Sequence, residues 1–247
     1  MGENLHGKVA IVTGASRRIG AATARALHAA GANVVIHHRG ADDAAALVSE
    51  LERARANSTA RVRADLLHAD APRIVVEAAL AAFGRIDVLV NNASMFYPTT
   101  VGEITATHWD ELVGSNLRAP LFLSQAAAPH LARAKGAIIN ITDIHAERPL
   151  KGYAVYSVAK AGLAGLTRVL ALELAPDVRV NAVAPGAIAW PEDGQFDPAE
   201  RERIVSTTPL GRVGSPEDIA RAALALCAMP FVTGQTVAVD GGRSVFL

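Results

Sequence analysis

The sequence predicts a single α/β domain over residues 1–247, built on one doubly wound parallel sheet of about seven strands with helices on both faces. Short apolar runs alternate with longer alanine-rich segments along the whole chain, as strands and helices do when right-handed crossovers join parallel strands. The apolar runs are continuous rather than alternating, which is typical of strands covered on both faces. No Ser/Gly linker, repeat or low-complexity tract divides the chain into two domains.

The first half of the chain supplies four expected strands and three expected helices. Continuous apolar or β-branched runs predict strands at 9–12, 33–36, 60–64 and 87–91. Alanine-rich segments predict helices that end near residue 30, cover 41–56 and cover 71–83, the last of them stopped by Gly84.

The second half continues the alternation. Strands are expected at 136–143, 178–183 and 236–239, and helices at 153–174, 198–205 and 216–227. A long helical stretch over 107–133 contains Asn116, and we expect Pro120 and Pro129 to kink or break it, because proline removes a backbone donor.

A glycine-bearing turn joins the first strand to the first helix in Thr13 to Gly20. Glycine lets the backbone approach a ligand, and the free N–H groups and dipole of the helix N-terminus favour anions. We expect the phosphate site of a nucleotide here; the alternative is an ordinary strand-to-helix turn, but the position after the first strand of the domain favours the nucleotide site. The expected cofactor contacts here are Gly14, Ser16, Arg17, Arg18 and Ile19, the two arginines as cationic donors.

The second strand is followed by His37-His38-Arg39-Gly40, and no acidic residue occurs there before Asp42. An acid at this place binds the ribose hydroxyls and selects NAD, whereas a basic cluster suits the 2′-phosphate of NADP. We therefore expect NADPH/NADP⁺ as the cofactor. Arg39 is the leading candidate, with His38 or Arg17 assisting; a solvated basic loop is the alternative.

Other polar residues also follow strand ends, and ligands of such sheets bind beyond the carboxyl ends of the strands. Asp65 and Leu66 are expected at the adenine. The remaining residues expected on this rim are Asn92, Ala93, Ser94, Thr142, Asp143, Pro185, Gly186 and Ile188.

Tyr156 and Lys160 stand four residues apart on an expected helix, so their side chains lie on one face. A nearby ammonium lowers the pKa of a phenol, which is ordinarily near ~10, and makes the pair a tunable acid/base. By itself the spacing is more often a solvated helix face. The convergence of strand ends on one rim favours the chemical interpretation.

Composition excludes several classes of function. The 24 acidic and 24 basic residues give zero net charge, which argues against a nucleic-acid partner. No apolar run approaches the roughly 18 residues of a membrane span, and the polar stretch Met1–Lys8 does not resemble a signal peptide, so a cytoplasmic location is expected. The one cysteine, Cys227, rules out a disulfide within the chain and is expected to be a core residue. No metal site is predicted.

Taken together, these motifs resemble the short-chain dehydrogenases/reductases over nearly the whole chain. The resemblance implies an NAD(P)-dependent oxidoreductase, usually a homotetramer. It implies that Tyr156 donates the proton, that Lys160 lowers its pKa and holds the nicotinamide ribose, and that Asn116 positions a water in a proton relay. The motifs are Thr13-Gly14…Gly20, Asn91-Asn92-Ala93, Asn116, Tyr156…Lys160, Pro185-Gly186 and Asp240-Gly241-Gly242.

Two departures from the common pattern of that family indicate which branch of it the sequence resembles. Arg18 stands where the glycine turn usually has its middle glycine, and Asp143 stands where the catalytic serine is usual. An ionised carboxylate repels the oxyanion of a ketone substrate but suits a substrate with N–H donors or basic nitrogens. Both changes, with the run Asn91–Pro98, are similar to the pteridine reductase branch.

That branch implies a flat pterin or folate as the substrate partner. Phe96 would hold it against the nicotinamide by stacking, or else packs under its loop. Ser94 would bind cofactor phosphate or the pterin edge, and Arg18 the pyrophosphate or that edge. Trp190 lies in an expected substrate loop near 187–210 and either covers the pterin side chain or anchors the loop. Tyr153 has the wrong spacing from Lys160 for the acid and is expected to be structural or to lie at the margin of the site.

The sequence thus predicts an NADPH-dependent reductase that takes a dihydropterin or dihydrofolate to its tetrahydro form. The catalytic set is Tyr156, Lys160, Asp143 and Asn116. A ketone or 3-oxoacyl-thioester reductase of the same family is the nearer alternative, and a non-catalytic NADPH-binding protein is the more distant one.

Overall fold

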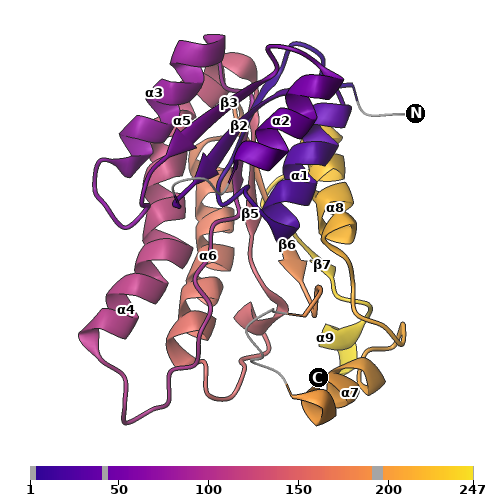
Figure 1. Cartoon of the computed structure of the whole chain (residues 1–247). Helices are drawn as coiled ribbons and strands as arrows, with labels where there is room; N and C mark the ends of the chain where they lie inside the picture. Colours follow the sequence, from indigo (N-terminus) through magenta and orange to yellow (C-terminus); the bar gives the residue numbers. More distant parts are fainter. Residues whose placement is uncertain (1–3, 41–43, 191–196, 247) are drawn as a thin grey trace.

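The computed structural model describes residues 4–40, 44–190 and 197–246 (Figure 1). Seven parallel strands form one sheet in the order β3-β2-β1-β4-β5-β6-β7, which confirms the predicted fold class. The order reverses after β1, so a crevice opens there at the carboxyl ends of the strands. The strands are β1 (Val9–Val12), β2 (Asn33–His38), β3 (Thr59–Arg63), β4 (Val88–Asn91), β5 (Ala137–Ile141), β6 (Arg179–Pro185) and β7 (Thr236–Val239).

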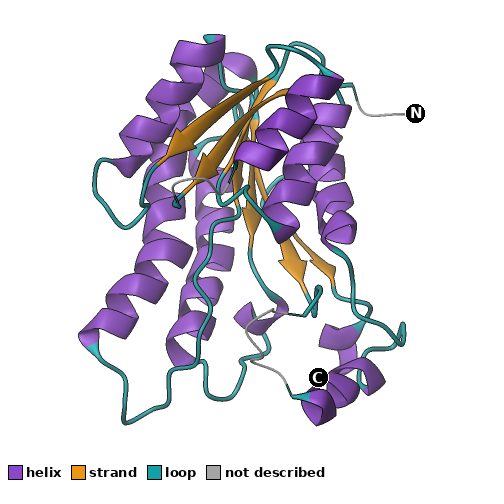
Figure 2. Cartoon of the chain, viewed as in Figure 1, coloured by secondary structure: helices purple, strands orange, loops and turns teal. Residues whose placement is uncertain are grey.

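Helices cover both faces of this sheet (Figure 2). One face carries α1 (Arg18–Ala29), α2 (Ala45–Ala54) and α8 (Pro216–Ala228), while the other carries α3 (Ala71–Phe83), α5 (Ala119–Ala134) and α6 (Ala154–Glu173). The remaining helices are α4 (Ala106–Val113), α7 (Pro198–Ser206) and α9 (Arg243–Phe246).

Alternate strand residues divide between two hydrophobic cores, as the period of two in a strand requires. On β1, Ala10 and Val12 pack with α1 and α8, whereas Val9 and Ile11 pack with α3 and α5. Both faces are therefore apolar, which explains the continuous apolar runs in the sequence.

The elements lie close to their predicted positions, with differences at the ends. The second strand runs two residues beyond its predicted end, through His37 and His38, because both pair with β3. The sixth strand extends to Pro185 through pairing with β7. The helix expected over 41–56 is shorter, since α2 covers Ala45–Ala54 and residues 41–43 lie outside the described part of the chain.

The long helix expected over 107–133 is irregular directly before Pro120. Its α4 and α5 parts are joined by a π-helical turn, Gly114–Arg118, whose centre is Asn116. Pro120 has no N–H, so the carbonyl of Asn116 cannot receive the usual bond from four residues on. Pro129 is accommodated inside α5.

Among the described residues, α6 alone is long and apolar enough to span a membrane, and 56% of its most apolar window is buried inside the domain. Its buried side includes Tyr156, Lys160 and Leu163. The burial is that of a core helix, and α6 carries the acid/base pair into the molecule.

Candidate active site

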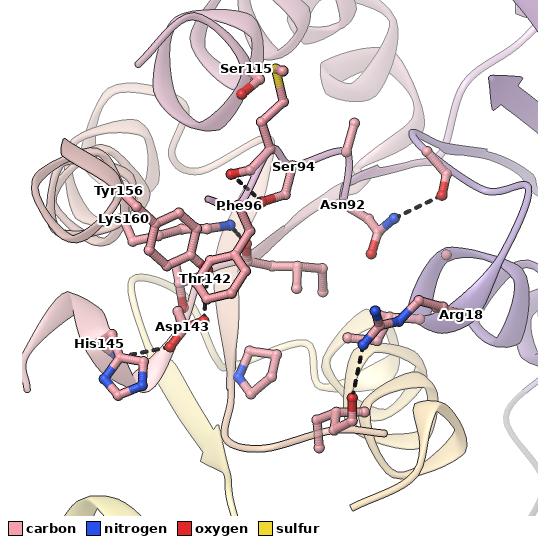
Figure 3. Close-up of a pocket in the computed structure, with 18 of the residues that line it drawn as sticks. Arg18, Asn92, Ser94, Phe96, Ser115, Thr142, Asp143, His145, Tyr156 and Lys160 are labelled. Atoms are coloured by element: carbon pink, nitrogen blue, oxygen red, sulfur yellow. Dashed lines mark hydrogen bonds between the residues drawn. The ribbon is translucent and has the colours of Figure 1, made fainter. Parts of the chain in front are cut away.

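A cavity of about 910 Å³ opens at the carboxyl ends of the strands. It extends from the glycine turn after β1 to Tyr156 and on to α7, and Figure 3 shows part of its lining. Every predicted site residue lines this cavity except Asn116. The residues predicted at the strand ends therefore do lie together on one cavity.

The glycine turn is held in place by side chains from the end of β4. Asn92 donates through Nδ2 to the carbonyls of Thr13 (2.8 Å) and Gly14 (3.1 Å). The Thr13 hydroxyl accepts the amides of Asn92 and Ala93 at 2.9 and 3.0 Å. A Cβ on Gly14 would lie 2.9 Å from the Cα of Ala93, and one on Gly20 would lie 2.2 Å from the Gly14 carbonyl oxygen. The turn is compact because only glycine fits at both positions.

Arg18 has a left-handed backbone, with φ at +51°, at the position where the family pattern has glycine. This conformation is unfavourable for a residue with a Cβ, and it directs the guanidinium across the cavity. It donates to the carbonyls of Ile188 (3.1 Å) and Ala189 (3.0 Å), and Figure 3 shows it on the side opposite Tyr156. Arg18 therefore ties the glycine turn to the segment after β6.

The end of β2 contains a residue that sequence analysis missed. The ring of His37, only 2% exposed, accepts the Gly14 amide at Nδ1 (3.1 Å), so Nε2 carries the proton and donates to the Ala64 carbonyl (3.0 Å). Burial is the main reason that the pKa of His37 falls to about 4. A neutral imidazole thus connects the glycine turn, β2 and the end of β3.

The two basic residues next along the chain differ in exposure. His38 is buried, and its Nδ1 donates to the Gly40 carbonyl at 2.6 Å, which holds the loop after β2. Arg39 is exposed at the cavity edge, and its carbonyl accepts from Arg63 Nε at 3.2 Å. Of the two, Arg39 has the side chain that is free to meet an anion at the cavity edge.

Asp143 and Tyr156 form the polar centre of the cavity. The Tyr156 hydroxyl donates to Asp143 Oδ2 at 2.7 Å, and Asp143 Oδ1 accepts the His145 amide at 2.8 Å. Lys160 donates from Nζ to the Ile141 carbonyl at 2.9 Å and lies 5.7 Å from the centre of the Tyr156 ring. The three side chains come from the end of β5 and one face of α6.

The predicted lowering of the Tyr156 pKa is wrong for this arrangement. Burial raises the pKa of Tyr156 well above 10, and the Asp143 carboxylate raises it further, because both disfavour a phenolate. Burial also lowers the pKa of Lys160 to about 8, against the opposing charge of Asp143. The phenol is therefore protonated at neutral pH.

Asn116 lies behind the cavity wall. Its amide donates to the carbonyls of Met95 and Leu112, both at 2.9 Å, and its oxygen accepts from Ser94 Oγ at 2.6 Å. The side chain is fully occupied, so any relay role belongs to the backbone carbonyl that Pro120 leaves without its α-helical partner.

The aromatic residues form a cluster beside the polar centre. Phe96 stacks on Tyr153, with ring centres 4.7 Å apart and an interplanar angle of 12°, and meets the edge of Tyr156 at 4.8 Å. Tyr153 thus lines the cavity with Phe96, which agrees with the expected place at the margin of the site. Trp190 lines the cavity with Arg201 over its ring at 5.3 Å. The 191–196 part of the expected substrate loop lies outside the described residues.

One end of the cavity is lined by residues that were not predicted individually. Glu200, Arg203 and Ile204 lie within the expected substrate loop near 187–210, and Arg243 directly follows the Asp240-Gly241-Gly242 motif. His145, Leu150 and Lys151 have no motif to mark them. The described residues include no group of three His, Cys, Asp or Glu side chains that could hold a metal ion.

The strand order and the cavity at the carboxyl ends of the strands are those of a Rossmann-type α/β domain. A family model described as enoyl-(acyl carrier protein) reductase matches residues 14–244. The chain belongs to the short-chain dehydrogenase/reductase family, whose members use NAD(P)(H).

Individual relatives point to different substrates. Pteridine reductase 1 from Leishmania tarentolae is 38% identical over 280 residues, covering 96% of this chain and 96% of that protein. A 3-oxoacyl-[acyl-carrier-protein] reductase from Synechocystis is 39% identical over 248 residues, covering 98% and 99%. The crystal structure of a putative short-chain alcohol dehydrogenase from Sinorhizobium meliloti superposes with a TM-score of 0.95 at 32% identity over the full length of both chains.

Proposed function

We propose that this protein uses NADPH to reduce a C=N bond of a dihydropterin. The hydrogen bond of 2.7 Å between the Tyr156 hydroxyl and Asp143 carries the proposal. A carboxylate at this position opposes the oxyanion of a ketone, whereas it can accept an N–H donor of a pterin ring. Similarity to pteridine reductase 1 supports the same substrate class.

The residues present fit the cofactor. The glycine turn lines the cavity at the N-terminus of α1, where free backbone N–H groups favour a phosphate, and Arg17 and Arg39 line the cavity as cations. Arg39 suits a 2′-phosphate, and no acidic side chain follows β2 before Asp42. When bound, NADPH supplies the hydride.

The protein contributes the proton and its placement. Tyr156 stays protonated at neutral pH and donates to the ring nitrogen next to the carbon being reduced. Lys160 then stabilises the phenolate as an adjacent cation, and Asp143 orients the phenol through the bond to Oδ2. Phe96 and Tyr153 exclude water from this side of the cavity.

A substrate panel tests the proposal. NADPH oxidation is measured with dihydrobiopterin, dihydromonapterin, dihydrofolate and an acetoacetyl thioester, for the wild type and for Tyr156→Phe. We expect turnover of a pterin and a loss of about 10³-fold in kcat in the variant, with NADPH affinity nearly unchanged. Near-wild-type turnover by Tyr156→Phe would contradict the role of Tyr156 as the proton donor.

A second candidate is a 3-oxoacyl-thioester reductase, which the relative from Synechocystis and the description of the matching family model favour. Asp143 argues against it. Turnover of the acetoacetyl thioester without any pterin turnover would establish this alternative. In that case Asp143→Ser should raise thioester turnover, because the substitution removes the charge that faces the oxyanion.

A further inference from the structure

The end of the cavity beyond Tyr156 is lined by three cations: Lys151 in the loop before α6, Arg203 on α7 and Arg243 at the start of α9. None of the three has a carboxylate oxygen within 4.0 Å among the described residues. Lys151 and Arg203 are exposed, so their side chains can reach a ligand at the cavity mouth.

Arg243 is the least expected of the three because it is only 6% exposed. Its Nη1 donates to the Ile204 carbonyl at 2.9 Å and to the Thr207 hydroxyl. The nearby carboxylate of Asp240 is already used, accepting the amides of Gly242 (2.9 Å) and Ser244 (2.6 Å). A buried guanidinium with only neutral acceptors costs free energy that an anion would offset.

Arg203 adds to that cost. Burial lowers the pKa of Arg243, and the like charge of Arg203 lowers it further against the opposing effect of Asp240. Glu200 also lines this wall, but it forms no ion pair with Arg203 or Arg243. Among the described residues, these three cations face the carboxylates of Glu200 and Asp240, which leaves a net positive charge at this end. The end is therefore electrostatically complementary to an anion.

The anions of the cofactor have their own sites elsewhere. The glycine turn follows β1 and Arg39 follows β2, whereas α7 and α9 follow β6 and β7 at the other side of the sheet. Figure 1 shows α7 and α9 together, away from α1 and α2. The cationic end is thus left for a group carried by the substrate.

We propose that Lys151, Arg203 and Arg243 bind the carboxylates of the substrate, so that the preferred substrate is a dihydropterin with a glutamate-bearing tail, of the dihydrofolate class. This rests on the proposed pterin reduction and selects among its substrates. A dihydropterin with a neutral side chain carries no negative charge to pair with these cations.

The test compares two substrates that share a ring and differ in the tail. Steady-state constants for dihydrofolate and dihydrobiopterin are measured with the wild type, Arg203→Gln, Lys151→Gln and the double variant. Arg61→Gln, which removes an exposed charge on β3 outside the cavity, is the matched control. We expect each single variant to lower kcat/KM for dihydrofolate about fivefold through KM, and to leave dihydrobiopterin within about twofold. Added salt should weaken only dihydrofolate.

A binding measurement separates this inference from the proposed function. The tail alone, p-aminobenzoylglutamate, is titrated calorimetrically into the NADPH-loaded wild type and variants. If the tail binds, the variants weaken its binding and no pterin is turned over, the anion site would be supported and the proposed reaction contradicted. Pterin turnover with equal effects of the variants on both substrates, or with no tail binding, would overturn the inference alone.

Discussion

At the scale of single residues, the phenol of Tyr156 is governed by a carboxylate 2.7 Å away and by burial, while the ammonium of Lys160 lies 5.7 Å from its ring. Burial keeps the phenol neutral and makes the ammonium easier to deprotonate, since it disfavours both charges. At neutral pH Tyr156 is therefore a protonated acid beside the Lys160 cation, and Lys160 loses its charge at a pH only slightly above neutral.

The pKa of Lys160, lowered to about 8, sets an alkaline limit. Above that pH the ammonium becomes neutral and no longer stabilises the phenolate, so kcat should fall about tenfold per pH unit. The measurement is kcat against pH with both substrates saturating. In Lys160→Arg the decline should move to higher pH, because a guanidinium keeps its charge. An unchanged decline in that variant would assign it to another group.

His37 gives a second prediction at this scale. His37→Leu leaves the Gly14 amide without an acceptor, which should weaken NADPH about tenfold, while His37→Asn keeps an acceptor near Nδ1 and should restore most of the affinity. Fluorescence titration with NADPH measures both. Equal loss in the two variants would reduce His37 to a packing residue.

The same ring makes stability depend on pH. Its folded pKa of about 4 lies below the unfolded value of 6.5, so its contribution is complete above pH 6.5 and is lost as pH falls towards 4. The contribution is roughly 3 kcal/mol by the size of the shift. Urea unfolding between pH 4 and 7 should show this slope in the wild type and a shallower one in His37→Leu.

At the scale of elements, the cofactor site is a set of strand ends tied to one another by side chains. Asn92 and Thr13 join the ends of β4 and β1, His37 joins β2 to both the glycine turn and β3, and Arg18 joins the turn to the segment after β6. Each of these hydrogen bonds joins two strand ends, so together they fix the positions of the strand ends that line the crevice.

The loop after β2 selects the cofactor in this arrangement. Arg39→Asp should weaken NADPH about a hundredfold and NADH by less than about threefold, because it removes a cation from the 2′-phosphate and adds a repelling charge. Dissociation constants of the two cofactors measure the difference. Arg61→Asp on β3 serves as a charge control. Equal losses for NADPH and NADH would contradict a 2′-phosphate contact at Arg39.

At the scale of the whole molecule, α6 serves the active site on its buried side and leaves apolar residues exposed on the other. Val158, Val169 and Leu172 are 56%, 55% and 79% exposed. We propose a cytoplasmic homotetramer, as the family resemblance implies, with this face of α6 in a subunit contact. A charge placed there would have to be buried without a partner.

Leu172→Glu should therefore lower the oligomeric state of the protein. Sedimentation velocity measures the mass of the wild type and of the variant. Val101→Glu, an exposed position (81%) before α4, is the control with the same charge change. A wild type that sediments as a monomer, or a variant with the mass of the wild type, would contradict this role of α6.

The amino-acid sequence was sufficient to predict the helix–sheet–helix layers of the domain and the edge of the sheet where the cavity lies. Continuous apolar runs such as Val9–Val12 require cover on both faces, and glycine, amide and carboxylate residues at the strand ends mark the edge where ligands bind. These signals are local, since they depend only on the period of apolar residues and on turn chemistry. Together with the family resemblance, which supplied Phe96 and Trp190, they predicted a set of residues that all line the cavity except Asn116.

The contacts between individual side chains of the site could not be predicted from the sequence and depend on the tertiary structure. Asp143 meets Tyr156 13 positions along the chain, His37 meets Gly14 across 23, and Arg18 meets Ile188 across 170. Arg203 in the expected substrate loop and Arg243 after the Asp240-Gly241-Gly242 motif are far apart in the sequence, and only the packing of α7 and α9 around one cavity brings them together. Partner choice and pKa depend on burial and on neighbours distant in sequence, which is why Tyr156 is more basic, not more acidic, than its spacing from Lys160 predicted.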